Sequence, residues 1–104
     1  MSEIDKPLEN DNLQWDAETR KKFDQMIEKV PIFMRPIAKK QVSKKAENIV
    51  RDDKRSVINE KDMVDAFFAA TPFGFHGPMM TDMTDLNIDY KKYGHPIDYS
   101  NFGK

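Results

Sequence analysis

The chain has 104 residues, a formal net charge of −1 and 38% hydrophobic residues. This length suits one small domain with tails, and the near-neutral charge argues against a generally cationic nucleic-acid binder. The sequence contains no cysteine, which excludes disulfides, a thiol nucleophile and cysteine-ligated zinc or iron–sulfur clusters.

The N-terminal segment is acidic and the middle of the chain is basic. Residues 1–18 carry one lysine against six carboxylates, and residues 35–55 carry eight Lys or Arg against three carboxylates. The start lacks the apolar stretch of a signal peptide, and the longest strongly apolar run, AFFAA, is too short to span a bilayer. We expect an extended acidic arm over residues 1–14. We also expect a cytoplasmic location, with a place on the cytoplasmic face of a membrane complex left open.

The first helix is predicted from Asp16 to Val30. Asp16 suits a helix N-cap, and Val30 precedes a proline, a position that disfavours helical geometry. Between them, apolar residues recur at the helical spacing i, i+3, i+4 and i+7, at Phe23, Met26, Ile27 and Val30.

Two prolines mark the joint between this helix and the next. Pro36 fits the first turn of a helix, where its missing N–H group costs nothing. We therefore expect residues 31–35 to form a tight corner, with Phe33 packed inward against Phe23 and Phe67.

A second, longer helix is predicted from about Pro36 to Asp53. One face is apolar, and Lys40, Lys44 and Arg51 lie on the opposite face. This basic stripe is a candidate electrostatic contact with a partner, and a solvated helix face is the alternative. The apolar face consists of Ala38, Val42, Ala46, Ile49 and Val50.

A third helix follows a short extended pair, Val57 and Ile58. Asn59 suits an N-cap, and Asp62 three residues later resembles a capping box. Apolar residues cover much of this helix, so we expect it to be buried and to end at the Thr71-Pro72 dipeptide. The fold class is therefore all-α, a small domain of three helices (short, long, short) over residues 15–70.

The C-terminal segment, residues 71–104, contains all four glycines and three of the six prolines, and no periodicity persists in it. It also holds six of the eleven aromatic residues, whereas disordered segments are poor in aromatics. We predict an irregular tail that becomes ordered along a partner. The expected partner-binding residues are Phe73, Phe75, Met79, Met80, Tyr90, Tyr93, Tyr99 and Phe102.

Several motifs in residues 13–68 resemble the small C-terminal domain of the B subunit of light-independent protochlorophyllide reductase. That domain begins with Trp and an acidic-Ala start, continues through a Val-Pro-x-Phe-x-Arg joint and a basic helix with Glu, and has an Ile-Thr-like pair before its last helix. Asn59 replaces the usual Thr, and Lys54 stands where a glycine is usual. The matching residues are Trp15, Ala17, Glu18, Val30, Pro31, Phe33, Arg35, Lys39, Lys40, Glu47 and Ile58.

The resemblance implies an all-helical fold and a setting in photosynthesis or tetrapyrrole chemistry. The ligands of that subunit's cluster are absent, so we expect a non-catalytic accessory subunit that docks on a larger photosynthetic or tetrapyrrole-binding complex, without cofactor or nucleic acid. One alternative is a histone-like DNA-binding protein, which the short–long–short helices suggest and the charge disfavours. Another is a component of a tetrapyrrole-reductase-related enzyme.

His76 and His95 are the only histidines in the sequence. Either could ligate a pigment magnesium or haem iron. The alternative is that both pack in loops, in which case the chain has no metal site.

Overall fold

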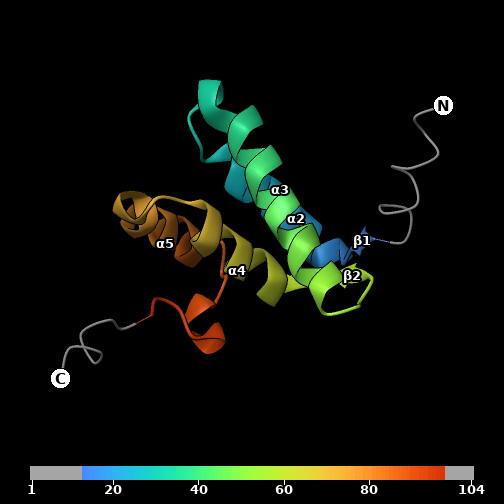
Figure 1. The fold of residues 1–104 in the computed structure, drawn as a ribbon. Coiled ribbons are helices and arrows are strands. Elements are labelled where there is room, and N and C mark those ends of the chain that lie inside the picture. Colours follow the sequence, from blue (N-terminus) through green and yellow to red (C-terminus); the bar gives the residue numbers. More distant parts are fainter. Residues whose placement is uncertain (1–12, 98–104) are drawn as a thin grey trace.

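In the computed structural model of this chain, residues 13–97 are described. They form an all-α domain with one minimal sheet, which confirms the predicted fold class (Figure 1). Strands β1 (Gln14–Trp15) and β2 (Val57–Ile58) pair in parallel, with Gln14 opposite Val57. The helices are α2 (Ala17–Glu28), α3 (Arg35–Asp52), α4 (Glu60–Ala70) and α5 (His76–Asp85), and the 3₁₀ turns are η2 (Ile32–Met34), η3 (Phe73–Phe75) and η4 (Tyr90–Tyr93).

Both predicted helix N-caps, at the starts of α2 and α4, are present in the structure. The carboxylate of Asp16 accepts hydrogen bonds from the Thr19 backbone N–H at 3.1 Å and from its hydroxyl at 2.9 Å. Asn59 and Asp62 form the expected capping box, in which the Asp62 carboxylate accepts from the Asn59 N–H at 2.8 Å. Each cap satisfies N–H groups that the first turn of a helix leaves without a partner.

The two halves of the chain repeat one plan, although no internal repeat is visible in the sequence. Each half runs from a short strand through a helix, a proline, a 3₁₀ turn and a second helix. Both second helices end in a residue with positive φ, Lys54 (58°) and Asn87 (60°). In each, the next N–H reaches back five residues, from Arg55 to Val50 and from Ile88 to Met83, which is the Schellman ending.

One hydrophobic core runs through both halves. Phe23 lies between Trp15 and Phe67, with ring centroids 4.7 and 6.0 Å away. The most extensive contact between elements joins α3 and α4. The buried face of α3 carries Val42, Ala46 and Val50, as the helical periodicity predicts.

The segment from residue 71 to residue 97 differs from the predicted irregular tail. It forms helix α5 and the turn η4, which fold back on α4 (Figure 1). Met79, Met83 and Ile88 are buried in the common core, so this segment belongs to the same domain. Prediction failed because Gly77 and Pro78 in the first turn of α5, and Gly74 in the turn before it, obscure the short apolar face of this helix. Residues 1–12 of the expected acidic arm and residues 98–104 of the tail lie outside the described residues.

The predicted packing of Phe33 is also wrong. The corner at Pro31 is tight, as expected, but the Phe33 side chain points to solvent and is 80% exposed. Phe23 and Phe67 already contact each other, and the 3₁₀ turn directs residues 32–34 away from them.

Candidate functional site

The first prominent surface feature is the corner between α2 and α3, here called corner 1 (residues 30–37). The Met34 N–H donates to the Pro31 carbonyl at 2.9 Å, which closes the 3₁₀ turn. Arg35 donates from Nε to the Val30 carbonyl at 2.8 Å and from Nη2 to the Glu28 carbonyl at 2.6 Å. Corner 1 is therefore rigid, and it presents four exposed apolar side chains: Ile32, Phe33, Met34 and Ile37.

The corner between α4 and α5, corner 2 (residues 71–78), repeats this geometry. The Phe75 N–H donates to the Pro72 carbonyl at 2.9 Å. His76 takes the place of Arg35, because its Nε2 lies 2.8 Å from the Thr71 carbonyl oxygen, again five residues back. Corner 2 presents Phe73, which is 77% exposed, and Phe75.

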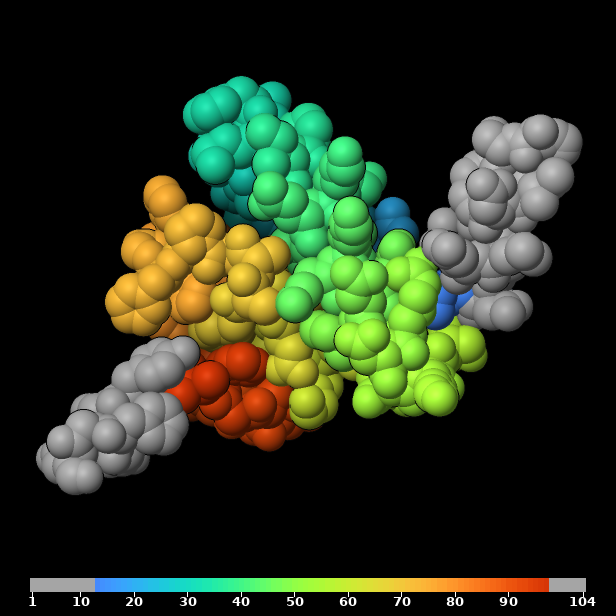
Figure 2. Space-filling model, in the orientation of Figure 1, coloured from blue at the N-terminus to red at the C-terminus, as the bar shows by residue number. Residues whose placement is uncertain are grey.

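Both corners lie far from the strand pair. In each half, the helix that follows the strand carries the chain away from the sheet before the corner turns it. Figure 1 shows β1 and β2 at the right of the molecule, with the start of α3 at the top and the start of α5 at the left. Figure 2 shows the same two regions, teal and gold, at the upper left of the surface, on either side of a recess.

The two corners differ in charge. Residues 29–46, around corner 1, contain six Lys or Arg and no Asp or Glu. Residues 66–81, around corner 2, contain no Lys, Arg, Asp or Glu at all. The same local geometry therefore displays a cationic apolar surface in one half and a neutral apolar surface in the other.

The structure divides the residues that the sequence assigned to partner binding. Phe73 and Phe75 are exposed and available. Met79 is buried, and Met80, Tyr90 and Tyr93 are partly buried and pack against the core, so these four are poor candidates for anchoring a partner. Tyr99 and Phe102 lie outside the described residues.

The sequence analysis did not identify the four exposed apolar side chains of corner 1 as a surface feature, although the position of one of them, Ile37, was a signal. At 100° per residue, Ile37 falls on the outward face of α3 beside Lys40 and Lys44, which are both exposed. The third member of the predicted basic stripe, Arg51, instead bonds Asn48 at 3.1 Å and pairs with Glu47 at 3.6 Å. The stripe thus reduces to its two lysines next to corner 1.

Both histidines have roles within the fold. His95 stacks on Phe68, with centroids 4.2 Å apart and rings 5° from parallel, and its Nε2 donates to the Asp65 carboxylate at 2.7 Å. His76 meets the same Phe68 edge-on at 5.1 Å. Within residues 13–97 there is no group of three His, Asp or Glu side chains that could hold a metal ion.

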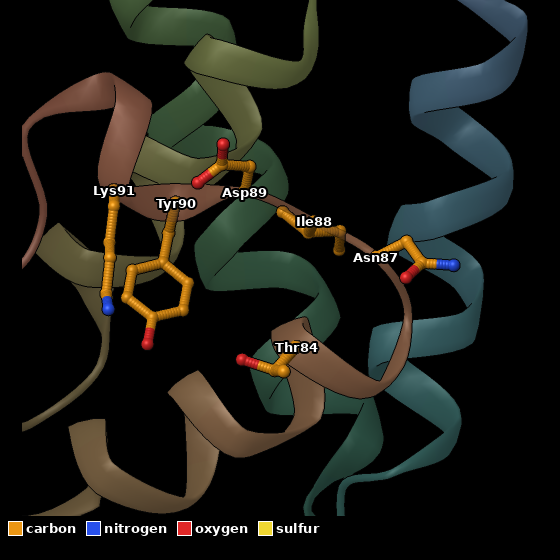
Figure 3. A pocket seen from close by; sticks show the side chains of 6 residues that line it. All are labelled: Thr84, Asn87, Ile88, Asp89, Tyr90 and Lys91. Carbon is orange, nitrogen blue, oxygen red and sulfur yellow. The ribbon is translucent and has the colours of Figure 1, made fainter.

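A surface hollow of about 370 Å³ lies between the end of α5 and η4 (Figure 3). Asp89 and Asn87 point away from Tyr90, so the polar groups do not converge on one point. The Thr84 hydroxyl is already bonded to the Met80 carbonyl at 3.0 Å. The hollow therefore lacks the convergent polar groups of a ligand site. Its lining consists of Thr84, Asn87, Ile88, Asp89, Tyr90 and Lys91.

The bidentate contact between Arg55 and Asp62 supports the fold. Arg55 donates to both carboxylate oxygens of the buried Asp62, at 2.7 and 3.1 Å. Burial by itself raises the pKa of Asp62, but the hydrogen bonds from Arg55 and from the Asn59 N–H outweigh it and lower the pKa below its ordinary value. The contact fixes the start of α4 against the loop that follows α3.

The comparison with protein families identifies the chain. The family described as "Protein of unknown function (DUF2621)" matches residues 2–97. The chain belongs to this family. The repeated corners described above therefore lie within the part of the chain that characterises the family.

A curated relative adds one description. The chain is similar to "Membrane protein YneK" of Bacillus subtilis (strain 168), with 26% identity over 86 residues, which are 83% of this chain and 61% of the relative. The chain thus spans about three fifths of that relative's length. No solved structure matches. Among residues 13–97, no helix is both long and apolar enough to cross a bilayer.

Proposed function

We propose that this chain is a non-catalytic docking subunit that binds a larger protein assembly through corner 2. The observation that carries this is the pair Phe73 and Phe75, two large aromatic side chains that are 77% and 60% exposed in an uncharged stretch of the chain. The cores of protein interfaces are enriched in aromatic residues and depleted in charge, and corner 2 has this composition.

Rigidity favours the same role. The 3₁₀ hydrogen bond at Pro72 and the His76–Thr71 hydrogen bond hold corner 2 in one conformation before any partner arrives. A preformed surface loses less conformational entropy on association than a flexible tail does. The proposed binding surface is therefore corner 2 instead of the extended tail expected from the sequence. Of the aromatic residues expected to bind a partner, it retains Phe73 and Phe75.

The setting of the assembly is a further proposal. The resemblance to the protochlorophyllide reductase domain supports photosynthetic or tetrapyrrole metabolism. The printed name of the Bacillus relative supports a membrane-bound complex. Together they favour a cytoplasmic subunit at the periphery of such a complex.

The test is cross-linking in the native host followed by mass spectrometry, on the wild type, on Phe73→Ser/Phe75→Ser and on the matched control Phe33→Ser/Ile37→Ser. All four side chains are exposed, so both variants should keep the wild-type circular dichroism spectrum and melting temperature. We expect cross-links from residues near corner 2 to one assembly, lost in the corner 2 variant and kept in the control. Unchanged cross-links in the corner 2 variant would contradict the proposed function.

A further inference from the structure

Corner 1 combines two chemical features that corner 2 does not. Its four exposed apolar side chains form a crest, and the surrounding residues 29–46 carry six cations without a single carboxylate. A stretch of this length ordinarily mixes both signs of charge. One carboxylate from another element, that of Asp85, approaches Lys29. The remaining excess of cations favours an anionic partner.

The cations lie beside the crest. Ile37, Lys40 and Lys44 occupy positions i, i+3 and i+7 of α3, so they share its outward face and follow one another along it. Lys39 and Lys45 are exposed on the same helix. No ion pair formed among residues 13–97 involves any of these four lysines.

The remaining cations near corner 1 have partners in the fold. Arg35 donates its guanidinium hydrogens to the carbonyls at the end of α2. The Lys29 ammonium lies 3.9 Å from the Asp85 carboxylate. The charge available to a partner is therefore that of the α3 lysines, and the apolar crest stands at one end of their row.

We propose that corner 1 binds the surface of an anionic lipid bilayer. The crest enters the boundary between headgroups and acyl chains, and the α3 lysines contact lipid phosphates. This boundary places apolar and anionic groups next to each other, as corner 1 places its crest next to the α3 lysines. Nucleic acid supplies the phosphates but gives no comparable place for the aliphatic Ile32 and Ile37.

The lipid contact depends on the proposed function in one respect: a subunit docked on a membrane-bound complex lies next to a bilayer. The two surfaces differ in charge, since corner 2 is neutral and corner 1 cationic. Corner 1 is also rigid, because Arg35 ties it to α2, so its apolar side chains are exposed before any bilayer is met.

The test is sedimentation of the purified full-length chain with vesicles, of phosphatidylcholine alone and of phosphatidylcholine mixed with phosphatidylglycerol. We expect binding to the mixed vesicles only, and binding that falls as salt rises. A lysine or arginine at an anionic surface changes partitioning about fivefold, so Lys40→Gln/Lys44→Gln should weaken binding about 25-fold. Phe33→Ser/Ile37→Ser should abolish it, and Phe73→Ser/Phe75→Ser, the matched control, should leave it unchanged.

Several results would overturn the lipid contact. Binding to neither vesicle, equal binding to both vesicles, or full binding by Phe33→Ser/Ile37→Ser would each do so. A wild type that ignores vesicles but binds duplex DNA, or that dimerises through Phe33, would show that corner 1 serves another partner. If the chain does not bind vesicles but the cross-links of corner 2 persist, the lipid contact is wrong and the proposed function stands. If the cross-links are absent but the chain binds vesicles, the proposed function is wrong and the lipid contact stands.

Discussion

Phe33 and Phe23 are the same residue type in opposite environments. Phe33 is 80% exposed, whereas Phe23 is fully buried between Trp15 and Phe67. Phe33→Ala should therefore leave the free energy of unfolding within about 0.5 kcal/mol of wild type, as for most surface changes. Phe23→Ala should lower it by about 3–5 kcal/mol. Urea unfolding of the two variants checks both values, and a large loss for Phe33→Ala would place that side chain back in the core.

Asp62 makes the free energy of unfolding depend on pH. Its folded-state pKa lies below the ordinary value of 3.8, so the unfolded chain binds its proton more readily. The contribution of Asp62 is fully present above that ordinary value and is lost as the pH falls through the folded-state pKa. Asp62→Asn should cost about 1–3 kcal/mol at pH 7 through its weakened hydrogen bonds.

The same variant should lose less stability than wild type on acidification below about pH 4, where carboxylates protonate. Thermal melts across this range provide the measurement. Asp24→Asn is the control, because Asp24 is exposed in its pair with Arg20. Parallel acid curves for Asp62→Asn and wild type would show that another carboxylate carries the effect.

Lys54 adopts a left-handed backbone conformation, with φ of 58°, at the end of α3. This conformation costs a residue with a side chain about 1–2 kcal/mol, and glycine adopts it freely. Lys54→Gly should therefore stabilise the fold by up to about 1 kcal/mol, after glycine's greater freedom in the unfolded chain is allowed for. The same change at Lys45, inside α3, should destabilise by about 1 kcal/mol. Thermal melts that moved in the same direction for both would refute this explanation.

At the scale of elements, His95 helps to hold the turn η4 on α4. His95 stacks on Phe68 and bonds Asp65, while Tyr90 meets the same Phe68 ring at 6.0 Å. His95→Ala removes a partly buried hydrogen bond to a carboxylate, a loss of about 1.5–3 kcal/mol. Amide exchange should then rise over residues 90–95 and stay low in α2 and α3.

A neighbouring exposed residue serves as the control. Lys92→Ala changes the same turn without touching Phe68 or Asp65, so it should leave amide protection as in wild type. Equal exchange in His95→Ala and wild type would mean that Tyr90 and Ile88 hold the turn without the histidine.

At the scale of the whole molecule, the domain needs its second half. Met79, Met83 and Ile88 lie in the core with Phe67 and Phe68. Each buried residue of this size contributes about 2–5 kcal/mol, and small domains hold only about 5–15 kcal/mol in total. A chain cut after Ala70 should therefore lose its cooperative thermal transition. Phe73→Ala/Phe75→Ala in the full-length chain should keep it, and a cooperative melt of the cut chain would show that α2 to α4 suffice.

Local chemistry was readable from the sequence alone. Some features depend only on residues within one or two turns, so the short-range pattern determines them. These are the caps at Asp16 and Asn59, the capping box of Asp62 and the proline joint after Val30. The buried face of α3 was likewise visible, because helical periodicity requires only the order of apolar residues.

Which apolar residues are buried in the core depends on tertiary packing. Phe33 follows Pro31 by two residues and Met79 follows Pro78 directly, both in apolar stretches, yet the first is exposed and the second buried. Burial depends on the space that distant elements leave: Trp15 and Phe67 already enclose Phe23, whereas α4 has an open side that α5 and η4 cover. Both causes act at the two corners. Local hydrogen bonds determine the shape of each corner, whereas the packing of the two halves determines which of its side chains remain exposed.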